Sequence, residues 1–287
     1  MRVLLTADLH YNHPRSKPLA RDLIDQINRT GCDVLVVVGD TAVADGDSLE
    51  QCLSLVDFKG PKLFIAGNHE LWTRSGESYA IYTTQLPQRV RAMGWQWLEN
   101  DPHVVADVAI VGSVGWYDYS FAQANLGIPI RFYRRKVSPG AAARLSEEYA
   151  ELLTDTGDVP AHAMEIVARW NDGRHVSLGR TDEQFLDELL ARLDQQLASL
   201  AHAKTIVAAI HHLPFKELLP PSHMAQWDFA KAYLGSGAIG ELLMKYPNVR
   251  HVYCGHSHFP CEATVGHVHA VNIGSGYRVK TFKQLEL

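Results

Sequence analysis

The chain has 287 residues, of which 46% are hydrophobic and 21% are charged, and its formal net charge is −5. This composition is that of an ordinary globular protein, and it excludes disorder as the dominant state and collagen-like or low-complexity architectures. The mildly acidic balance argues against a protein that grips nucleic acid by charge alone, because such domains are usually strongly basic. The length suffices to bury a sizeable core in one large domain or two small ones.

The sequence gives no sign of membrane insertion or secretion. No apolar run approaches the roughly 18 to 20 residues that a membrane span needs, and the first run stops at Asp8 and His10. The four cysteines include no Cys-x-x-Cys pair, which indicates reduced thiols. We therefore expect a cytoplasmic protein with no membrane partner. The 15 histidines are many for this length, and several stand next to Gly, Asp or Asn, which suggests metal chemistry.

The N-terminal third alternates between strand and helix patterns. Short apolar runs at 2–7, 33–38 and 62–66 predict strands, and the stretches 19–27 and 48–56 between them have helical spacing. This alternation predicts a parallel sheet with right-handed crossovers. Ligands of such sheets gather just beyond the carboxyl ends of the strands.

The middle of the chain changes character. Residues 104–114 predict a hairpin, and an irregular aromatic stretch follows at 116–133. Residues 141–154 and 181–200 look helical, and the second of these begins with a Thr-x-x-Gln capping box. We expect residues 116–200 to form an insertion that caps the rest of the domain.

Strand patterns resume in the last third of the chain. The runs 205–210 and 249–253 predict two more buried strands. Residues 261–287 alternate in the manner of an antiparallel meander.

Five polar segments each follow one of the predicted strands. They are Asp8-Leu9-His10, Gly39-Asp40, Gly67-Asn68-His69-Glu70, His211-His212 and Gly255-His256-Ser257-His258. Carboxylate oxygens, an amide oxygen and imidazole nitrogens together suit Mn, Fe, Zn or Co, and they include too many nitrogens for Ca or Mg. The sequence therefore predicts a metal site where these strands end.

The pattern D-x-H, G-D, G-N-H-E, H and G-H-x-H is similar to the signature of the calcineurin-like metallophosphoesterases. The resemblance covers residues 1 to about 115 and about 204 to 280. It implies an α/β fold, a four-layer α/β/β/α sandwich, in which residues 1–287 form a single domain with the mainly helical cap inserted at about 116–200.

The resemblance also implies a binuclear site. The metal ligands would be Asp8, His10 and His258 for one ion and Asn68, His211 and His256 for the other, with Asp40 bridging both. Two divalent ions would be the cofactors, with Mn favoured among Mn, Fe, Zn and Co. The ions would hold a bridging hydroxide that attacks phosphorus, and His69 would contact a phosphate oxygen and protonate the leaving group. Glu70 and Asn12 would orient ligands or line the rim.

One ligand stays open at this stage. The tandem His211-His212 does not settle which imidazole binds metal, and we favour His211 because it directly follows the strand.

The resemblance implies hydrolysis of a phosphate ester, and we favour a phosphodiesterase that acts on a small phosphorylated substrate. Alternatives are a phosphomonoesterase, a nuclease or a non-catalytic scaffold of the same fold. A nuclease would need a basic groove, which only residues 131–136 support, so nucleic acid is not the expected partner. The segment 41–47 lacks the Arg-Gly of Ser/Thr protein phosphatases, which disfavours that activity. The Leu-rich face of 181–200 leaves a homo-oligomer open.

Overall fold

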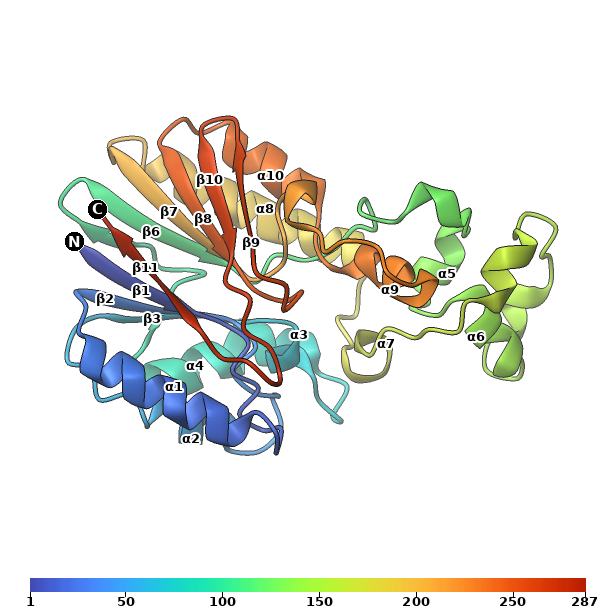
Figure 1. Cartoon of the computed structure of the whole chain (residues 1–287), viewed down its shortest axis with the longest axis horizontal. Coiled ribbons are helices and arrows are strands. Elements are labelled where there is room, and N and C mark those ends of the chain that lie inside the picture. The colour runs from blue at the N-terminus through green and yellow to red at the C-terminus, as the bar shows by residue number, and fades with distance from the viewer.

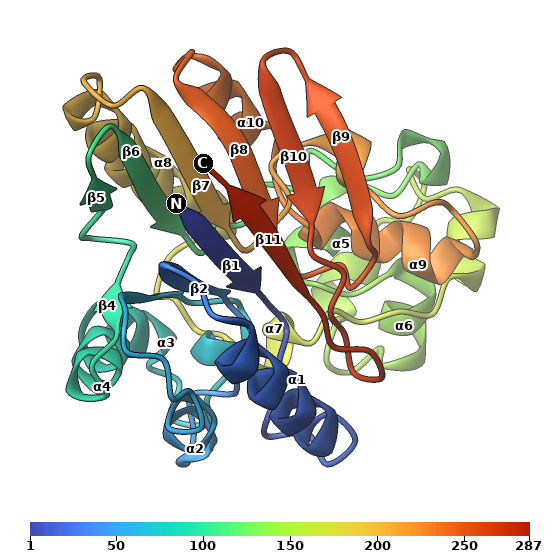
Figure 2. The same ribbon diagram turned by 60° about the vertical axis from the view of Figure 1, so that its left-hand side comes forward.

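The computed structural model describes all 287 residues, and it shows two β-sheets packed face to face with helices on their outer faces (Figures 1 and 2). This arrangement confirms the predicted four-layer α/β/β/α sandwich. None of the helices combines the length and apolarity that crossing a bilayer requires.

The first sheet contains the N-terminal strands. Its order is β11-β1-β2-β3-β4, in which β1 to β4 run parallel and β11 pairs antiparallel with β1. The strands are β1 (Arg2–Thr6), β2 (Val34–Val38), β3 (Lys62–Ile65), β4 (Gln96–Trp97) and β11 (Phe282–Glu286). The three apolar runs predicted as parallel strands are therefore confirmed.

The second sheet contains the later strands in the order β5-β6-β7-β8-β10-β9. Its centre is parallel, and its two edge strands pair antiparallel with their neighbours. The strands are β5 (His103–Val105), β6 (Val108–Ser113), β7 (Thr205–Ile210), β8 (Val249–Cys254), β9 (Cys261–Val265) and β10 (Val268–Asn272). The hairpin predicted at 104–114 corresponds to β5 and β6.

The core between the two sheets is built from alternate residues of their strands. Successive side chains of a strand point to opposite faces, so Val3 and Leu5 face the second sheet while Leu4 faces the helices. The second sheet contributes Ile110, Val207 and other buried residues of its inner face to the same core. Because both faces of each sheet are covered, the strands read as continuous apolar runs.

Helices cover the outer faces (Figure 1). Below the first sheet lie α1 (Lys17–Thr30), α2 (Ser48–Leu53) and α4 (Leu86–Ala92), with α3 (Ser78–Ala80) beside them. On the second sheet lie α8 (Asp182–Ser199) and α10 (Gly237–Met244). The predicted capping box of α8 is present, because Thr181 and Gln184 exchange hydrogen bonds between side chain and backbone.

A separate lobe projects beyond the strand ends (Figure 1). It comprises residues 116–178, with α5 (Ile130–Arg134), α6 (Pro139–Arg144) and α7 (Asp172–His175), and also α9 (Ala225–Ala230). The aromatic stretch at 116–133 helps to join these parts, since Tyr133 stacks on Phe229 of α9. The structure places α8, the last part of the predicted 116–200 insertion, on the sheet and outside this lobe.

Two of the elements predicted from the sequence are wrong. Residues 141–154 do not form one helix. The helix α6 ends at Arg144, and the exposed polar residues 146–148 that follow offer no apolar face to bury. Residues 261–287 do not form one meander either. The strands β9 and β10 form a hairpin, but β10 pairs parallel with β8, and β11 crosses to the first sheet, where Leu285 enters the core between the sheets.

Candidate metal centre and active site

Five loops meet where the central strands of both sheets end. The strands β1, β2 and β3 of the first sheet and β7 and β8 of the second each end just before one of the five polar segments. The topology therefore brings together side chains that are up to 250 residues apart in the chain, from Asp8 to His258.

Backbone strain is concentrated in these loops. Asp8, His10, Asp40, His256 and His258 have positive φ angles of 54°, 43°, 55°, 69° and 57°. Such left-handed conformations are uncommon for residues with a Cβ, and they persist where surrounding structure enforces them, often at functional sites.

One cluster of ligand-type atoms contains Asp8, His10, Asp40 and His258, all within 4.8 Å of one another. The Nε2 atoms of His10 and His258 are 2.9 Å apart, and Nε2 of His258 is 3.5 Å from Oδ1 of Asp8. Nε2 of His10 is 3.8 Å from Oδ2 of Asp40. These separations are close to those between neighbouring ligands of one transition-metal ion.

A second cluster contains Asp40, His211 and His256. Nε2 of His211 is 3.3 Å from Oδ1 of Asp40, so the two oxygens of Asp40 face the two clusters. Nδ1 of His211 lies 2.9 Å from the carbonyl oxygen of Val38, which fixes the ring with Nε2 toward Asp40. His212 is outside both clusters, and its ring packs against His256 at 4.2 Å.

The donor set fits two metal ions. Several buried ligand-type atoms have no hydrogen-bond partner, and a buried polar atom without a partner is costly unless something binds it. These atoms are Oδ2 of Asp8, Oδ1 of Asn68, Nε2 of His211 and Nδ1 of His256. The imbalance is what a site built for cations shows when only the protein atoms are counted.

The electrostatics of the site also favour cations. Burial opposes ionisation of Asp40, but the charges of His69 and His211 hold the pKa of its carboxyl well below the usual value. Burial lowers the pKa values of His10 and His256 well below their usual range, which keeps both imidazole rings neutral and able to bind metal. Burial also disfavours the charged form of His211, yet Asp40 raises its pKa to about 9.

Close backbone approach makes room for this arrangement. A Cβ added at Gly67 would collide with Oδ1 of Asp40 and would lie 2.7 Å from Nε2 of His211. A Cβ at Gly39 would lie 2.5 Å from Nδ1 of His211. Glycine is therefore required at both positions for steric reasons.

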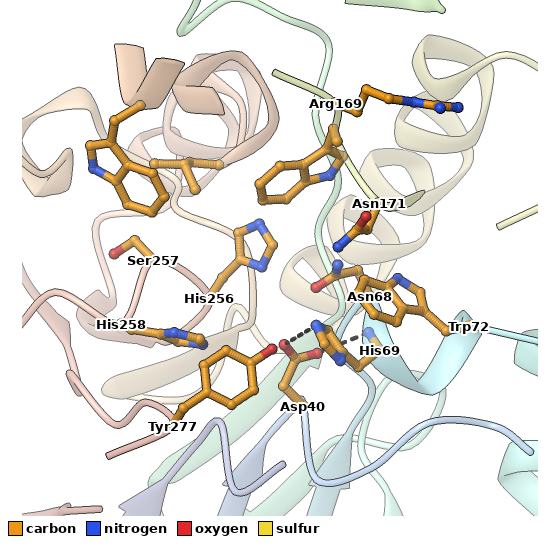
Figure 3. Close-up of a pocket in the computed structure, with 13 residues that line it drawn as sticks. Asp40, Asn68, His69, Trp72, Arg169, Asn171, His256, Ser257, His258 and Tyr277 are labelled. Carbon is orange, nitrogen blue, oxygen red and sulfur yellow. Dashed lines mark hydrogen bonds and ion pairs between the residues drawn. The ribbon is translucent and has the colours of Figure 1, made fainter. Parts of the chain in front are cut away.

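A pocket of about 240 Å³ opens over the two clusters (Figure 3). His69 lines it, and the ring of His69 stacks on Trp72 with centroids 3.7 Å apart. Its other lining residues come from the strand-end loops, from the lobe and from the C-terminal loop. They are Asp40, Asn68, Trp72, Arg169, Trp170, Asn171, Trp227, Leu234, His256, Ser257, His258 and Tyr277.

Comparison with known proteins agrees with this geometry. A model of the calcineurin-like phosphoesterase family matches residues 1–260. The chain belongs to the calcineurin-like phosphoesterase family. Members of this family typically bind two divalent metal ions, and this phosphoesterase has two Asp and His clusters that could hold them.

Solved structures share the fold. The phosphopantetheinyl hydrolase of Mycobacterium tuberculosis is 22% identical with a TM-score of 0.70, and the match covers 96% of this chain and 89% of that one. A dimetal phosphatase from Danio rerio is 16% identical with a TM-score of 0.55, covering 99% of this chain and 91% of that one. No curated protein sequence matches the phosphoesterase significantly.

Sequence reasoning missed most of the pocket wall. Trp72 and Trp170 carry no motif, and only the fold brings them to the pocket. Tyr277 stacks on His10 with ring centroids 4.4 Å apart, and the glycine-rich stretch 272–276 just before it was a weak signal of close approach to the site. Asn12 is exposed and does not line the pocket.

The basic run at 131–136 does not line the pocket either. Each of its four cations is paired with a carboxylate of the lobe or of α8. The pairs are Arg131 with Asp158, Arg134 with Glu183, Arg135 with Glu151 and Lys136 with Asp182. The run is therefore largely neutralised and offers little charge to a polyanion.

Proposed function

We propose that this phosphoesterase hydrolyses small phosphodiesters with two divalent metal ions, of which Mn is favoured over Fe, Zn and Co. The observation that carries the proposal is the convergence of two ligand clusters on Asp40 at the floor of an aromatic pocket. In this proposal Asp8, His10 and His258 hold one ion, Asn68, His211 and His256 hold the other, and Asp40 contacts both.

The chain's own groups would divide the work of hydrolysis. Two bound ions would activate water and neutralise charge on the phosphoryl oxygens. His69 lies over the clusters, with Nε2 at 3.8 Å from Oδ2 of Asp40, and it is fixed by its stack on Trp72. We assign His69 the contact with a phosphate oxygen and the transfer of a proton to the leaving group.

The pocket lining favours a diester over a monoester. A monoester brings a second negative charge, which a further cation in the pocket would stabilise. Arg169 is the single Arg or Lys among the 13 lining residues, and its guanidinium points away from Asp40 toward Glu148 and Tyr149 (Figure 3). Three tryptophans, Trp72, Trp170 and Trp227, instead offer apolar surface to a second ester substituent.

The alternatives have less support. A nuclease would need free cations along a groove, and the basic run is paired with carboxylates. A non-catalytic scaffold would have no need for His69 or for buried ligand atoms left without partners.

Hydrolysis of bis-p-nitrophenyl phosphate and p-nitrophenyl phosphate, measured side by side in excess Mn(II), tests the proposal. A phosphopantetheinyl diester should be included among the compounds tested, because the M. tuberculosis structure is named a phosphopantetheinyl hydrolase. We expect turnover of the diester to exceed that of the monoester. Activity on the monoester alone would replace the proposal with a phosphatase.

Asp40→Asn and Asp57→Asn form a matched pair of variants. Asp40 is buried between the clusters, whereas Asp57 is exposed and pairs only with Lys59. Asp40→Asn keeps the shape and removes the charge, so turnover should fall by more than about 100-fold. Asp57→Asn should leave turnover unchanged, and equal losses in both variants would contradict the proposed role of Asp40.

A further inference from the structure

A buried carboxylate of the lobe joins the pocket wall to the strand-end loops. Asp172, the first residue of α7, is fully buried and accepts four side-chain hydrogen bonds. Its Oδ1 accepts from Nδ2 of Asn68 at 2.9 Å and from Nε1 of Trp72 at 2.6 Å. Its Oδ2 accepts from Nε1 of Trp170 at 2.7 Å and from the hydroxyl of Tyr117 at 3.0 Å.

This contact fixes which way the Asn68 amide points. A carboxylate can only accept hydrogen bonds, so the amide atom that faces Asp172 must be the nitrogen. The carbonyl oxygen of Asn68 is therefore turned away from Asp172, and it is buried with no partner of its own. An amide oxygen held in this way is presented as a ligand.

The same carboxylate holds two tryptophans of the pocket against site histidines. Trp72 stacks on His69, and Trp170 meets the ring of His256 edge-on with centroids 5.8 Å apart. Both indoles line the pocket, and both donate their N–H to Asp172. One side chain thus fixes a candidate metal ligand and two walls of the pocket.

We infer that Asp172 is a positioning residue that sets the Asn68 carbonyl oxygen toward its metal ion and locks the lobe onto the metal centre. The inference rests on the proposed function, because it takes Asn68 as a metal ligand. Groups that orient a ligand are typically worth 10- to 100-fold in metal affinity. Asn68 is proposed as a ligand of one ion only, so we expect the loss to fall on that ion.

Asp172→Asn tests the inference at nearly constant volume. The new amide keeps one oxygen that accepts and presents an NH2 group in place of the other, so only some of the donors of Asn68, Trp72, Trp170 and Tyr117 keep an acceptor. Because residue 172 can then donate as well as accept, either orientation of the Asn68 amide can pair with it, and Asn68 loses its fixed orientation. We expect the ion held with His211 and His256 to bind about 10- to 100-fold more weakly, and the ion held by the other cluster to bind as in the wild type.

The matched control is Asp182→Asn. Asp182 is also buried and accepts from several lobe side chains, among them Trp116 at 2.8 Å, but it contacts no candidate metal ligand. It therefore reports the cost of losing a buried carboxylate alone.

Mn(II) binding to the metal-free full chain is measured by calorimetry. The coupled signal of a Mn(II) pair is measured by electron paramagnetic resonance.

The inference is supported if Asp172→Asn selectively weakens one of two Mn(II) ions and reduces the coupled signal while Asp182→Asn does neither. It is overturned if the wild type binds two ions and the two variants bind them equally well. A wild type that binds no second ion overturns the proposed function as well, so the two failures are distinguishable.

An exchange of the two side chains covers the case in which Asp172→Asn does not fold. In the double variant Asn68→Asp with Asp172→Asn, the hydrogen bond between the two positions is reversed, and an oxygen again faces the metal. We expect its second Mn(II) affinity to exceed that of Asn68→Asp alone, in which two carboxylates meet. An affinity no higher than that of the single variant would overturn the inference.

Discussion

The carboxylate of Glu70 accepts the backbone N–H of Asp40 at 2.9 Å, and the carboxylate of Asp40 accepts the backbone N–H of His69 at 2.9 Å. The loops after β2 and β3 therefore hold each other in place beneath the candidate metal centre. Glu70 also accepts the N–H groups of Gly67, Thr41 and Ala42, so four backbone donors converge on one buried side chain. This arrangement explains how a strained turn at Asp40 is maintained.

Glu70→Gln should destabilise the fold, although Glu70 is not itself a candidate metal ligand. The amide nitrogen of glutamine cannot accept, so some of the four N–H groups lose their partner in a buried site. We expect the free energy of unfolding to fall by about 3 kcal/mol, which urea denaturation measures. Glu77→Gln, at an exposed position, should be neutral, and an equally small change at Glu70 would show that the four bonds contribute little.

Gly67→Ala should weaken metal binding for steric reasons. The added methyl group would collide with Asp40 and His211, so the two side chains could no longer face one another. We expect Mn(II) affinity measured by calorimetry to fall by about 10-fold or more. Gly237→Ala is the matched control, because a Cβ there meets open space, and it should bind Mn(II) as the wild type does.

His211→Gln and His212→Gln should separate the two adjacent imidazoles. His211 belongs to the cluster with Asp40, whereas His212 lies outside it and packs against Trp116 and His256. We expect His211→Gln to lose one Mn(II) per chain and His212→Gln to keep both, with a stability loss of about 1 to 2 kcal/mol. The reverse pattern in metal analysis would assign the ligand to His212.

The ion pair between Glu50 and Arg89 should give a small acid-dependent term in stability. Hydrogen bonds from Arg89 lower the pKa of Glu50 below its usual 4.5, and Arg89 also donates to Ala44 and Gly46 in the loop after Asp40. The folded-state pKa is the lower one, so the contribution is complete above pH 4.5 and is lost as pH falls through the folded-state value.

Glu50→Gln measures this term by difference. Both side chains of the pair are partly exposed, at 24% for Arg89 and 32% for Glu50, so solvent weakens the attraction. The wild type should therefore be more stable by no more than about 1 kcal/mol near neutral pH. The difference between the two urea denaturation curves should shrink as the pH falls through the folded-state pKa of Glu50, and it should vanish below that pKa. A difference that persists there would have to come from something other than the charge of Glu50.

The strand-end loops could be predicted from the sequence because neighbouring residues in the chain carry the signal. Each apolar run predicts a strand, and polar residues such as Asp40 and Asn68 directly follow it, so parallel topology alone brings them to one edge. Positive φ angles at Asp8 and His256 could not be foreseen, since they arise from the way in which the loops hold one another.

The pocket wall depends on tertiary contacts that no local pattern encodes. Asp172 is 104 positions from Asn68, and nothing around it in the sequence distinguishes it from an ordinary turn residue. Likewise, alternation in residues 282–286 predicts a strand but not its sheet, because β11 pairs with β1 at the other end of the chain.

Metal content per chain tests the central claim most directly. Metal-free wild type and Asp40→Asn would each be saturated with Mn(II) and freed of excess ion by gel filtration. Their metal content would then be measured by inductively coupled plasma mass spectrometry. The two clusters that share Asp40 lead us to expect two Mn(II) ions per wild-type chain and at most one in Asp40→Asn. A wild-type chain that retains none, or a variant that retains as many as the wild type, would contradict the account.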